Sequence, residues 1–224
     1  MELPRADGSL LRRDFSNSYT VIEPTATVAP TLMNLLYAGI DNEIGISVPG
    51  IAPQDISATM TNGSLIRKGT MWSAKPLKVG QNAVISITAK TGGQLRQLAK
   101  KEFRVRALPD PTPYIEYTDA NGNPVMFKGG ALAKAILVNA DGIKAAIDDG
   151  ILNIPFQVRS FRTVFFDAMG NAIPEISNGS RFSDRQKEQI RRLSRGKYFY
   201  ISGVRAIGPD GTEREISVIE VRVN

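Results

Sequence analysis

NAVISITAK, residues 82–90, is the stretch that decides the fold class of this chain. It alternates small or branched apolar residues with polar ones, and successive side chains of a β-strand point to opposite faces of the sheet. The apolar set is Ala83, Ile85, Ile87 and Ala89. The pattern therefore predicts a strand with one face in a core and the other in water.

Shorter segments of the same kind lie on both sides of this strand. Residues 98–107 alternate Phe103, Val105 and Ala107 against arginines, and residues 44–48 (IGISV) place their apolar side chains on one face. Further strands are expected at residues 19–28, 31–37, 56–59, 65–68 and 71–74. Asn62-Gly63 predicts a hairpin between two of them. About seven short strands between turns favour an immunoglobulin-like β-sandwich.

A proline-dense joint follows, LPDPTP at residues 108–113. Pro109, Pro111 and Pro113 each fix their own φ and bias the preceding residue towards extended geometry. The joint is therefore predicted to be a stiff spacer between two domains. The expected organisation is a lead-in at residues 1–18, the sandwich at 19–108, the joint at 109–113 and an α+β domain at 114–224.

The second domain mixes strand and helix patterns. Strands are expected at residues 114–117, 198–207 and 215–223, and a long strand at 156–167 with a bulge near Ser160, where its apolar phase changes. Residues 142–149 have apolar side chains at helical spacing and are predicted as a helix, while residues 130–138 fit a helix or a strand.

The strongest helix pattern covers residues 183–193. Ser183 followed three residues later by Gln186 forms a capping box, in which each side chain satisfies a backbone N–H of the first turn. Asp184 in that turn suits the helix dipole. The helix has only a narrow apolar stripe and is expected to lie on a surface.

Composition removes most routes to catalysis. The 224 residues include no cysteine and no histidine, which excludes disulfides, thiol chemistry, imidazole metal sites and the histidine general base. Asp148 and Asp149 are adjacent, and in the predicted helix they would point about 100° apart, so they do not share a site. The chain is predicted not to be an enzyme and to need no cofactor.

Two short loops share a pattern, DANGN at residues 119–123 and DAMGN at residues 167–171. A calcium loop needs six or more oxygens with a bidentate carboxylate near its end, and the twelfth position counted from Asp119 is Gly130. Asp, Asn and Gly are the residues that tight turns need. The pattern predicts two similar hairpin turns and no metal site.

The formal charge is +6, which is a weak signal for nucleic acid in a chain of this length. The densest basic stretch spans residues 181–197, and only Asp184 and Glu188 offset it. Its members are Arg181, Arg185, Lys187, Arg191, Arg192, Arg195 and Lys197. This stretch is either a solvated helix face or a docking surface for an acidic protein, and we expect no nucleic-acid partner.

Aromatic residues occupy both phases of the strands near residues 165 and 199. Phe165, Phe166, Tyr198, Phe199 and Tyr200 cannot all point into one core, because neighbours along a strand face opposite sides. A strand that is apolar on both faces is sandwiched or lies at an interface. The pattern indicates association with another surface.

The run YAGIDNEIGISVPG, residues 37–50, resembles a signature of the third domain of the GldM/PorM family, and so does TNGSL at residues 61–65. The segment FRVRALPDPTP, residues 103–113, is similar to the family's entry into its fourth domain. The resemblance covers about residues 19–224. It implies the C-terminal half of a protein of the type IX secretion and gliding machinery.

What the resemblance implies is a scaffold. Family members are homodimeric periplasmic rods anchored in the inner membrane by an N-terminal helix, which partners a motor protein. Their far end contacts an outer-membrane-associated ring of a lipoprotein and its periplasmic partner. This chain would be the distal, periplasmic, force-transmitting portion, with motor contact made through a part absent here.

Two other classes fit the sequence less well. A carbohydrate-binding β-sandwich would need exposed aromatic platforms, and Trp72 is the only tryptophan. A carboxylate hydrolase would need two close buried acids, and the sequence offers no convincing pair.

Overall fold

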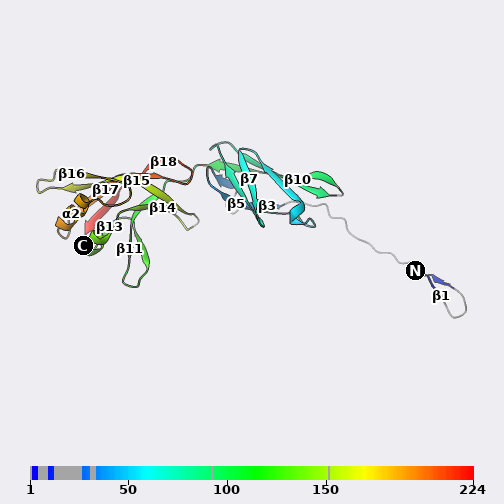
Figure 1. Ribbon diagram of the computed structural model, residues 1–224, viewed down its shortest axis with the longest axis horizontal. Coiled ribbons are helices and arrows are strands. Elements are labelled where there is room, and N and C mark those ends of the chain that lie inside the picture. The colour runs from blue at the N-terminus through cyan, green and yellow to red at the C-terminus, as the bar shows by residue number, and fades with distance from the viewer. Residues whose placement is uncertain (1, 5–9, 13–26, 31–33, 92, 151) are drawn as a thin grey trace.

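The computed structural model describes residues 2–4, 10–12, 27–30, 34–91, 93–150 and 152–224. Two β-rich bodies follow each other along the long axis, and the chain passes from one to the other once, after β10 (Figure 1). The fold class is as predicted: mainly β, with a sandwich followed by an α+β domain.

The first body is a sandwich of two four-stranded sheets among the described residues. One sheet has the order β3 (Thr27–Pro30), β5 (Asn42–Ser47), β8 (Met71–Pro76) and β7 (Gly63–Lys68). The other has the order β4 (Leu35–Tyr37), β10 (Gln94–Arg106), β9 (Ala83–Thr91) and β6 (Ile56–Met60). A 3-10 turn, η1 (Pro53–Asp55), precedes β6. This is the strand order of an immunoglobulin-like sandwich, so that prediction is confirmed.

The sandwich core consists of the residues that the alternation predicted. Ala83, Ile85, Ile87 and Ala89 on β9 are fully buried, and the opposite sheet contributes Ile44, which is also fully buried. Each strand thus supplies every second side chain to a layer between the sheets. The alternation of β10 holds through Val105, but the predicted Ala107 is exposed and Leu108 is buried instead.

The predicted hairpin at Asn62-Gly63 is wrong. β6 pairs with β9 and β7 pairs with β8, so this turn carries the chain from one sheet to the other. Asn62 takes a left-handed φ of 55°, and its side chain bonds to the carbonyls of Lys78 and Gln81 at 2.9 and 2.7 Å. The Asn-Gly pair supplies the φ values of a tight turn, but the core on both sides decides which sheet each strand joins.

Some predictions near the N-terminus fall outside the described residues. The strands predicted at residues 19–28 and 31–37 are described only from Thr27 and from Asn34 onward, where β3 and β4 lie. Within the predicted lead-in, β1 (Glu2–Pro4) and β2 (Leu10–Arg12) pair antiparallel.

The second body is built on a curled nine-stranded sheet. Its main path runs β12 (Pro124–Phe127), β11 (Thr112–Thr118), β14 (Lys144–Asp148), β15 (Asn153–Phe166), β17 (Tyr198–Ile207), β19 (Ile219–Val223) and β13 (Gly130–Leu132). β16 (Ala172–Asn178) pairs with β15, and β18 (Glu213–Ile216) pairs with β17. The register of β15 shifts at Ser160, so the predicted bulge is confirmed.

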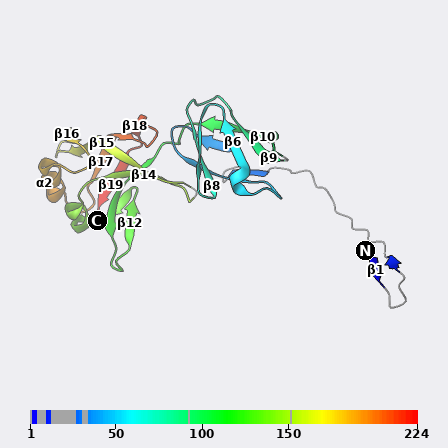
Figure 2. The ribbon, with the colours of Figure 1, turned by 45° about the vertical axis from the view of Figure 1, so that its right-hand side comes forward.

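Among the described residues, two helices complete the domain, α1 (Lys134–Asn139) and α2 (Asp184–Arg192). Helix α2 lies at the end of the domain away from the sandwich (Figure 2). Leu137 of α1 and Ile190 of α2 are fully buried in the same core as Phe161 and Phe199. Of the open alternatives at residues 130–138, the helix is correct for Ile136–Val138, which lie in α1, and a short strand, β13, precedes it.

The helix predicted at residues 142–149 is wrong, because Lys144–Asp148 forms β14. Ile143, Ala145, Ala146 and Ile147 are all buried. β14 lies inside the sheet, between β11 and β15, and it buries Ala145 and Ile147 on one face and Ala146 on the other, while Lys144 is exposed. A strand buried on both faces shows no alternation, so its apolar run matches helical spacing by chance. The predicted final strand at 215–223 is also two strands, β18 and β19, which pair with successive parts of β17.

The capping box of α2 is confirmed. Gln186 N–H donates to Ser183 Oγ at 3.2 Å, and Ser183 N–H donates to Gln186 Oε1 at 2.8 Å. Gln186 is fully buried and also donates to the Glu175 carbonyl at 2.9 Å, which ties the helix start to β16. The cap therefore fixes both the start of the helix and its position on the sheet.

Replacing Ser183 by alanine should lower the free energy of unfolding of the C-terminal domain by about 1 kcal/mol, the usual cost of losing an N-cap. Urea denaturation followed by circular dichroism measures the change. Ser194→Ala, at an exposed serine after the helix, is the matched control. Equal effects of the two substitutions would contradict the capping role.

Candidate functional site at the junction of the two domains

A loop at residues 37–42 is held rigid by the side chain of Asn42. Tyr37 N–H donates to Asn42 Oδ1 at 2.8 Å. The Asn42 amide nitrogen lies 2.9, 3.0 and 3.1 Å from the carbonyls of Tyr37, Ile40 and Ala74. One side chain thus satisfies the loop's own backbone and fastens it to β8. Sequence reasoning missed this role, although an Asn just before a strand is a known turn-former.

The same loop touches the second domain. Tyr37 and Ile40 pack against the C-terminal core, and Leu108, just beyond β10, is buried within it. Gly39 has a φ of +78°, and a Cβ placed there would lie 2.8 Å from Asp210 Cβ. Glycine is therefore required at this position both for its backbone conformation and for the close approach.

Arg214 is the centre of the junction on the C-terminal side. Its Nη2 lies 2.6 Å from Asp210 Oδ2, and the two side chains are only 10% and 8% exposed. Its Nε lies 3.4 Å from Asp110 Oδ1 in the joint, and its guanidinium lies 5.4 Å from the centre of the Phe156 ring. One cation therefore connects the turn at residues 208–212, the joint and β15.

This pairing perturbs both partners. The hydrogen bond from Arg214 lowers the pKa of Asp210 below its ordinary value of 3.8, against the opposing effect of burial. The same bond raises the pKa of Arg214. Asp210 also accepts from the Thr212 N–H at 3.1 Å, so it shapes the turn as well as pairing with the cation. The charged forms of both side chains stabilise the junction.

The three joint prolines lie in different surroundings. Pro109 is exposed in the connection between β10 and β11, whereas Pro111 and Pro113 are buried. Pro113 is a residue of β11 and lies opposite Ala145 of β14. The connection outside both sheets is thus only residues 107–111. The stiffness predicted for the prolines stays a prediction.

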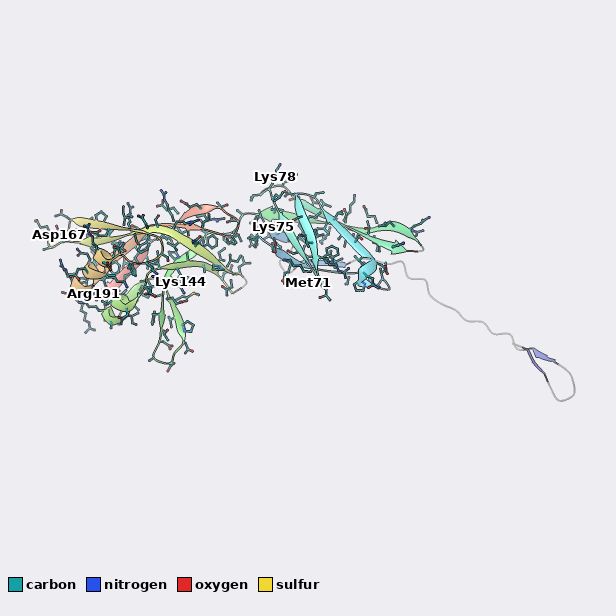
Figure 3. The ribbon with its side chains drawn as sticks, in the orientation of Figure 1. Met71, Lys75, Lys78, Lys144, Asp167 and Arg191 are labelled. Atoms are coloured by element: carbon teal, nitrogen blue, oxygen red, sulfur yellow. The ribbon has the colours of Figure 1, made fainter. Side chains whose placement is uncertain are left out.

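Six of the seven predicted basic residues lie on α2 or just after it, and Arg191 of this helix lies at the end of the C-terminal domain away from the sandwich (Figure 3). Arg191 and Arg192 share Glu188, at 3.6 and 3.1 Å, and Arg195 bonds to the Asn224 side chain at 3.3 Å. Arg181 lies before the helix and bridges to Gly142, so the structure places it against a different wall of the domain.

Residues 181–197 contain the seven basic residues and two acidic residues, which gives this stretch a net charge of +5. The rest of residues 109–224 contains eight basic and twelve acidic residues, or −4. The domain therefore has a basic end and an acidic remainder. We name the residues on and after α2 the basic end; its members are Arg185, Lys187, Arg191, Arg192, Arg195 and Lys197.

The aromatic residues divide between the two faces of the sheet. Phe165 and Phe199 stack in the core with ring centres 5.1 Å apart. Phe166 and Tyr198 are exposed on the opposite face by 38% and 48%, and Tyr200 lies beside them. We call these last three residues the aromatic face. Their ring planes are inclined to one another by 59–85°, so they pack edge to face.

The carboxylate patterns turn out to be structural. Asp119 accepts from the N–H groups of Asn121 and Asn123, and Asp167 makes the same two bonds with Met169 and Asn171. The backbone N–H of Asn123 is the main cause that lowers the pKa of Asp119, and the side-chain amide of Asn171 is the main cause that lowers the pKa of Asp167. The predicted pair of similar hairpin turns is thus confirmed, between β11 and β12 and between β15 and β16.

Adjacent Asp148 and Asp149 do not end a helix, because Asp148 is the last residue of β14 and Asp149 accepts from the Leu152 N–H at 2.8 Å in the following turn. Across the described ranges, no three acidic, cysteine or histidine residues group as metal ligands would. Among the same residues, no helix is both long and apolar enough to span a membrane.

The architecture is that of a modular β-protein, an immunoglobulin-like sandwich coupled to an α+β domain. The family model of the GldM third domain matches residues 25–106, and that of the GldM C-terminal domain matches residues 109–224. The chain belongs to the GldM family, so it is an extracytoplasmic component of the gliding and type IX secretion machinery. No curated protein matches the chain.

Replacing Asp210 by asparagine should destabilise the chain by about 1–3 kcal/mol at neutral pH, the usual range for a hydrogen bond to a charged group. Asparagine keeps the turn's bond to Thr212 but leaves Arg214 without its closest anion. Because the pKa of Asp210 is lowered by folding, its contribution is complete above pH 3.8 and is lost as the pH falls below that value.

Urea denaturation of both proteins between pH 7 and pH 2.5 measures this. The difference in unfolding free energy between the wild type and Asp210→Asn should shrink at the acid end. Glu213→Gln is the control, because that exposed carboxylate lies 3.9 Å from Arg205 and should contribute little at any pH. A difference that stays constant with pH would show that the Asp210 charge does not act at the junction.

Proposed function

We propose that the chain is a periplasmic scaffold that transmits force within the type IX secretion and gliding machinery, between an inner-membrane motor and an outer-membrane-associated ring. The observation that carries this proposal is the junction between the two domains, where the buried pair of Arg214 and Asp210 also reaches the exposed Asp110 of the connection. Arg214 joins Asp110 and Asp210, and the Asn42-held loop packs against the same turn. A link of this kind favours movement of the two domains as one unit, which a mechanical connector requires.

The proposal includes a non-enzymatic role. The chain contains neither histidine nor cysteine, and the acidic motifs in the described parts act as turn formers. Rigid β-structure occupies both domains, and the side chains with perturbed pKa at the junction are paired with one another. These features fit a protein that works through its shape and its contacts.

We further propose a homodimer and a docking end. The aromatic face offers apolar surface on a sheet that helices cover on its other side, which suits a second copy of the chain. The basic end lies at the pole remote from the sandwich and suits an acidic surface on the ring (Figure 3). Contact with the motor would be made through parts of the protein outside this chain.

The carbohydrate-binding alternative gains no support. Trp72 is 7% exposed, and Arg67 lies over its ring at 5.8 Å, so it is no open platform. The rings of the aromatic face are inclined to one another, so they do not form one flat platform. We therefore propose only the scaffold function.

The stiffness of the junction can be measured with spin labels, because the natural sequence has no cysteine to interfere. Lys100→Cys and Arg159→Cys place one exposed label on each domain. Double electron–electron resonance should give a narrow distance distribution for the wild type. Arg214→Ala should broaden it, since both anions then lose their shared cation.

Replacing the prolines at 109, 111 and 113 by glycine tests the joint in the same labelled background. We expect a broader distribution, because glycine removes the fixed φ. Arg205→Ala, at an exposed surface pair, is the control and should leave the distribution unchanged. A wild type that is already as broad as the Arg214→Ala variant would overturn the force-transmission proposal.

Docking by the basic end can be tested by capture from detergent-solubilised envelopes of the source bacterium. Arg185→Glu, Arg191→Glu and Arg195→Glu combined should reduce recovery of the ring lipoprotein at least tenfold, and wild-type recovery should fall with added salt. The control reverses three exposed cations of the sandwich, Arg96, Lys100 and Arg104. Equal losses for both variants would show a general charge effect and contradict docking at this end.

A further inference from the structure

The pairing of β11 with β14 stops partway along β11, where β14 begins. It runs from Thr112 opposite Ala146 to Tyr114 opposite Lys144. The residues before Lys144 turn away to another segment, where Ile143 N–H donates to the Ser180 carbonyl at 2.8 Å and Gly142 bridges to Arg181. The second half of β11 therefore loses its neighbour on this side.

The opened edge of β11 presents free backbone groups. Asp119 N–H donates to the Asn123 carbonyl at 2.9 Å, which places the backbone groups of Asp119 on the β12 side. Because these groups alternate between the two edges of a strand, those of Glu116 and Thr118 point away from β12. Among the residues that the structure describes, none pairs with them through its backbone.

This edge forms one wall of a cleft of about 600 Å³. The hairpin of β11 and β12 stands away from the rest of the domain (Figure 1). Ala135, Ile136 and Asn139 of α1 form the opposite wall, and Lys144 and Arg181 line the cleft as well. The volume lies in the range of pockets that hold small ligands or short peptide segments.

The lining suits an extended peptide with an acidic side chain. Ile136 is half-buried and offers apolar contact. Lys144 already pairs with Glu116, whereas no ion pair engages the exposed guanidinium of Arg181 within the described ranges. A guanidinium presents donors that match a carboxylate. The backbone edge would supply affinity, and the flanking side chains would supply selectivity, as in other cases of strand addition.

We propose that this cleft binds an extended segment of a partner protein, which adds as a strand to β11 at Glu116–Thr118 and places an acidic side chain against Arg181. The cleft is separate from the basic end, although the sequence grouped Arg181 with it. The inference does not depend on force transmission, because a flexible junction would leave the cleft unchanged.

The test uses a phage-displayed library of random 12-residue peptides, selected on the whole chain. Enriched peptides are synthesised with a fluorescein label, and their dissociation constants are measured by anisotropy. Thr118→Pro removes one N–H that points into the cleft and spares the pairing with β12. Ala135→Trp fills the cleft from the helix side. Each variant should weaken binding at least tenfold, and Arg181→Glu should do so for acidic peptides.

Arg159→Glu is the matched control, an exposed arginine outside the cleft that should leave affinity unchanged. Circular dichroism checks that each variant is folded, and hydrogen exchange of the wild type should show protection of the Glu116 and Thr118 amides on peptide addition. The proposal is overturned if no peptide is enriched. It is equally overturned if the enriched peptides bind Thr118→Pro and Ala135→Trp as tightly as the wild type.

Discussion

The buried ion pair of Arg214 and Asp210 is the constraint on which the relation between the two domains depends. A guanidinium stays charged at every pH that a protein meets, so it can be buried only where anions and hydrogen bonds compensate it. Asp210 comes from the turn after β17 and Asp110 from the connection between the domains. Asp210 compensates most of the charge, and the exposed Asp110 adds a second anion when the connection lies against that turn.

On the sandwich side of the junction, the loop at residues 37–42 is already fixed by its own hydrogen bonds. Asn42 uses both ends of its amide to hold residues 37–42, so little further ordering is needed when the loop meets Asp210. Leu108 completes the contact by leaving the alternation of β10 and entering the C-terminal core. The hydrogen bonds of Asn42 and the burial of Leu108 thus stabilise the same short contact between the domains.

Much of the fold could be predicted from the sequence, because its signals are local. The alternation in β9 gave one face of the sandwich core, and Ser183 with Gln186 gave the start of α2. The errors arose where contacts with distant parts of the chain determine the local structure. β14 shows no alternation because residues 145–147 are buried on both faces of the sheet, and the chain changes sheets at Asn62 because the core on each side decides which sheet each strand joins.

The candidate site was harder to predict than the fold. The basic residues were visible as a run, yet the structure separates Arg181 from the others, since a bridge to Gly142 holds it elsewhere. Arg214 gave no signal at all, because Asp110 lies far from it in the sequence. The open edge of β11 exists because its pairing with β14 ends at Tyr114, and no local sequence pattern indicates where that pairing ends.

The pairing of β4 with β10 has a mechanical consequence. These strands run parallel, with Leu35, Leu36 and Tyr37 opposite Arg104, Val105 and Arg106, and β10 is the last strand before the second domain. A pull between the chain before β4 and the chain after β10 would slide the two strands along each other. Their bonds would then carry the load together in shear, whereas a pull across an antiparallel hairpin opens its bonds one at a time like a zip.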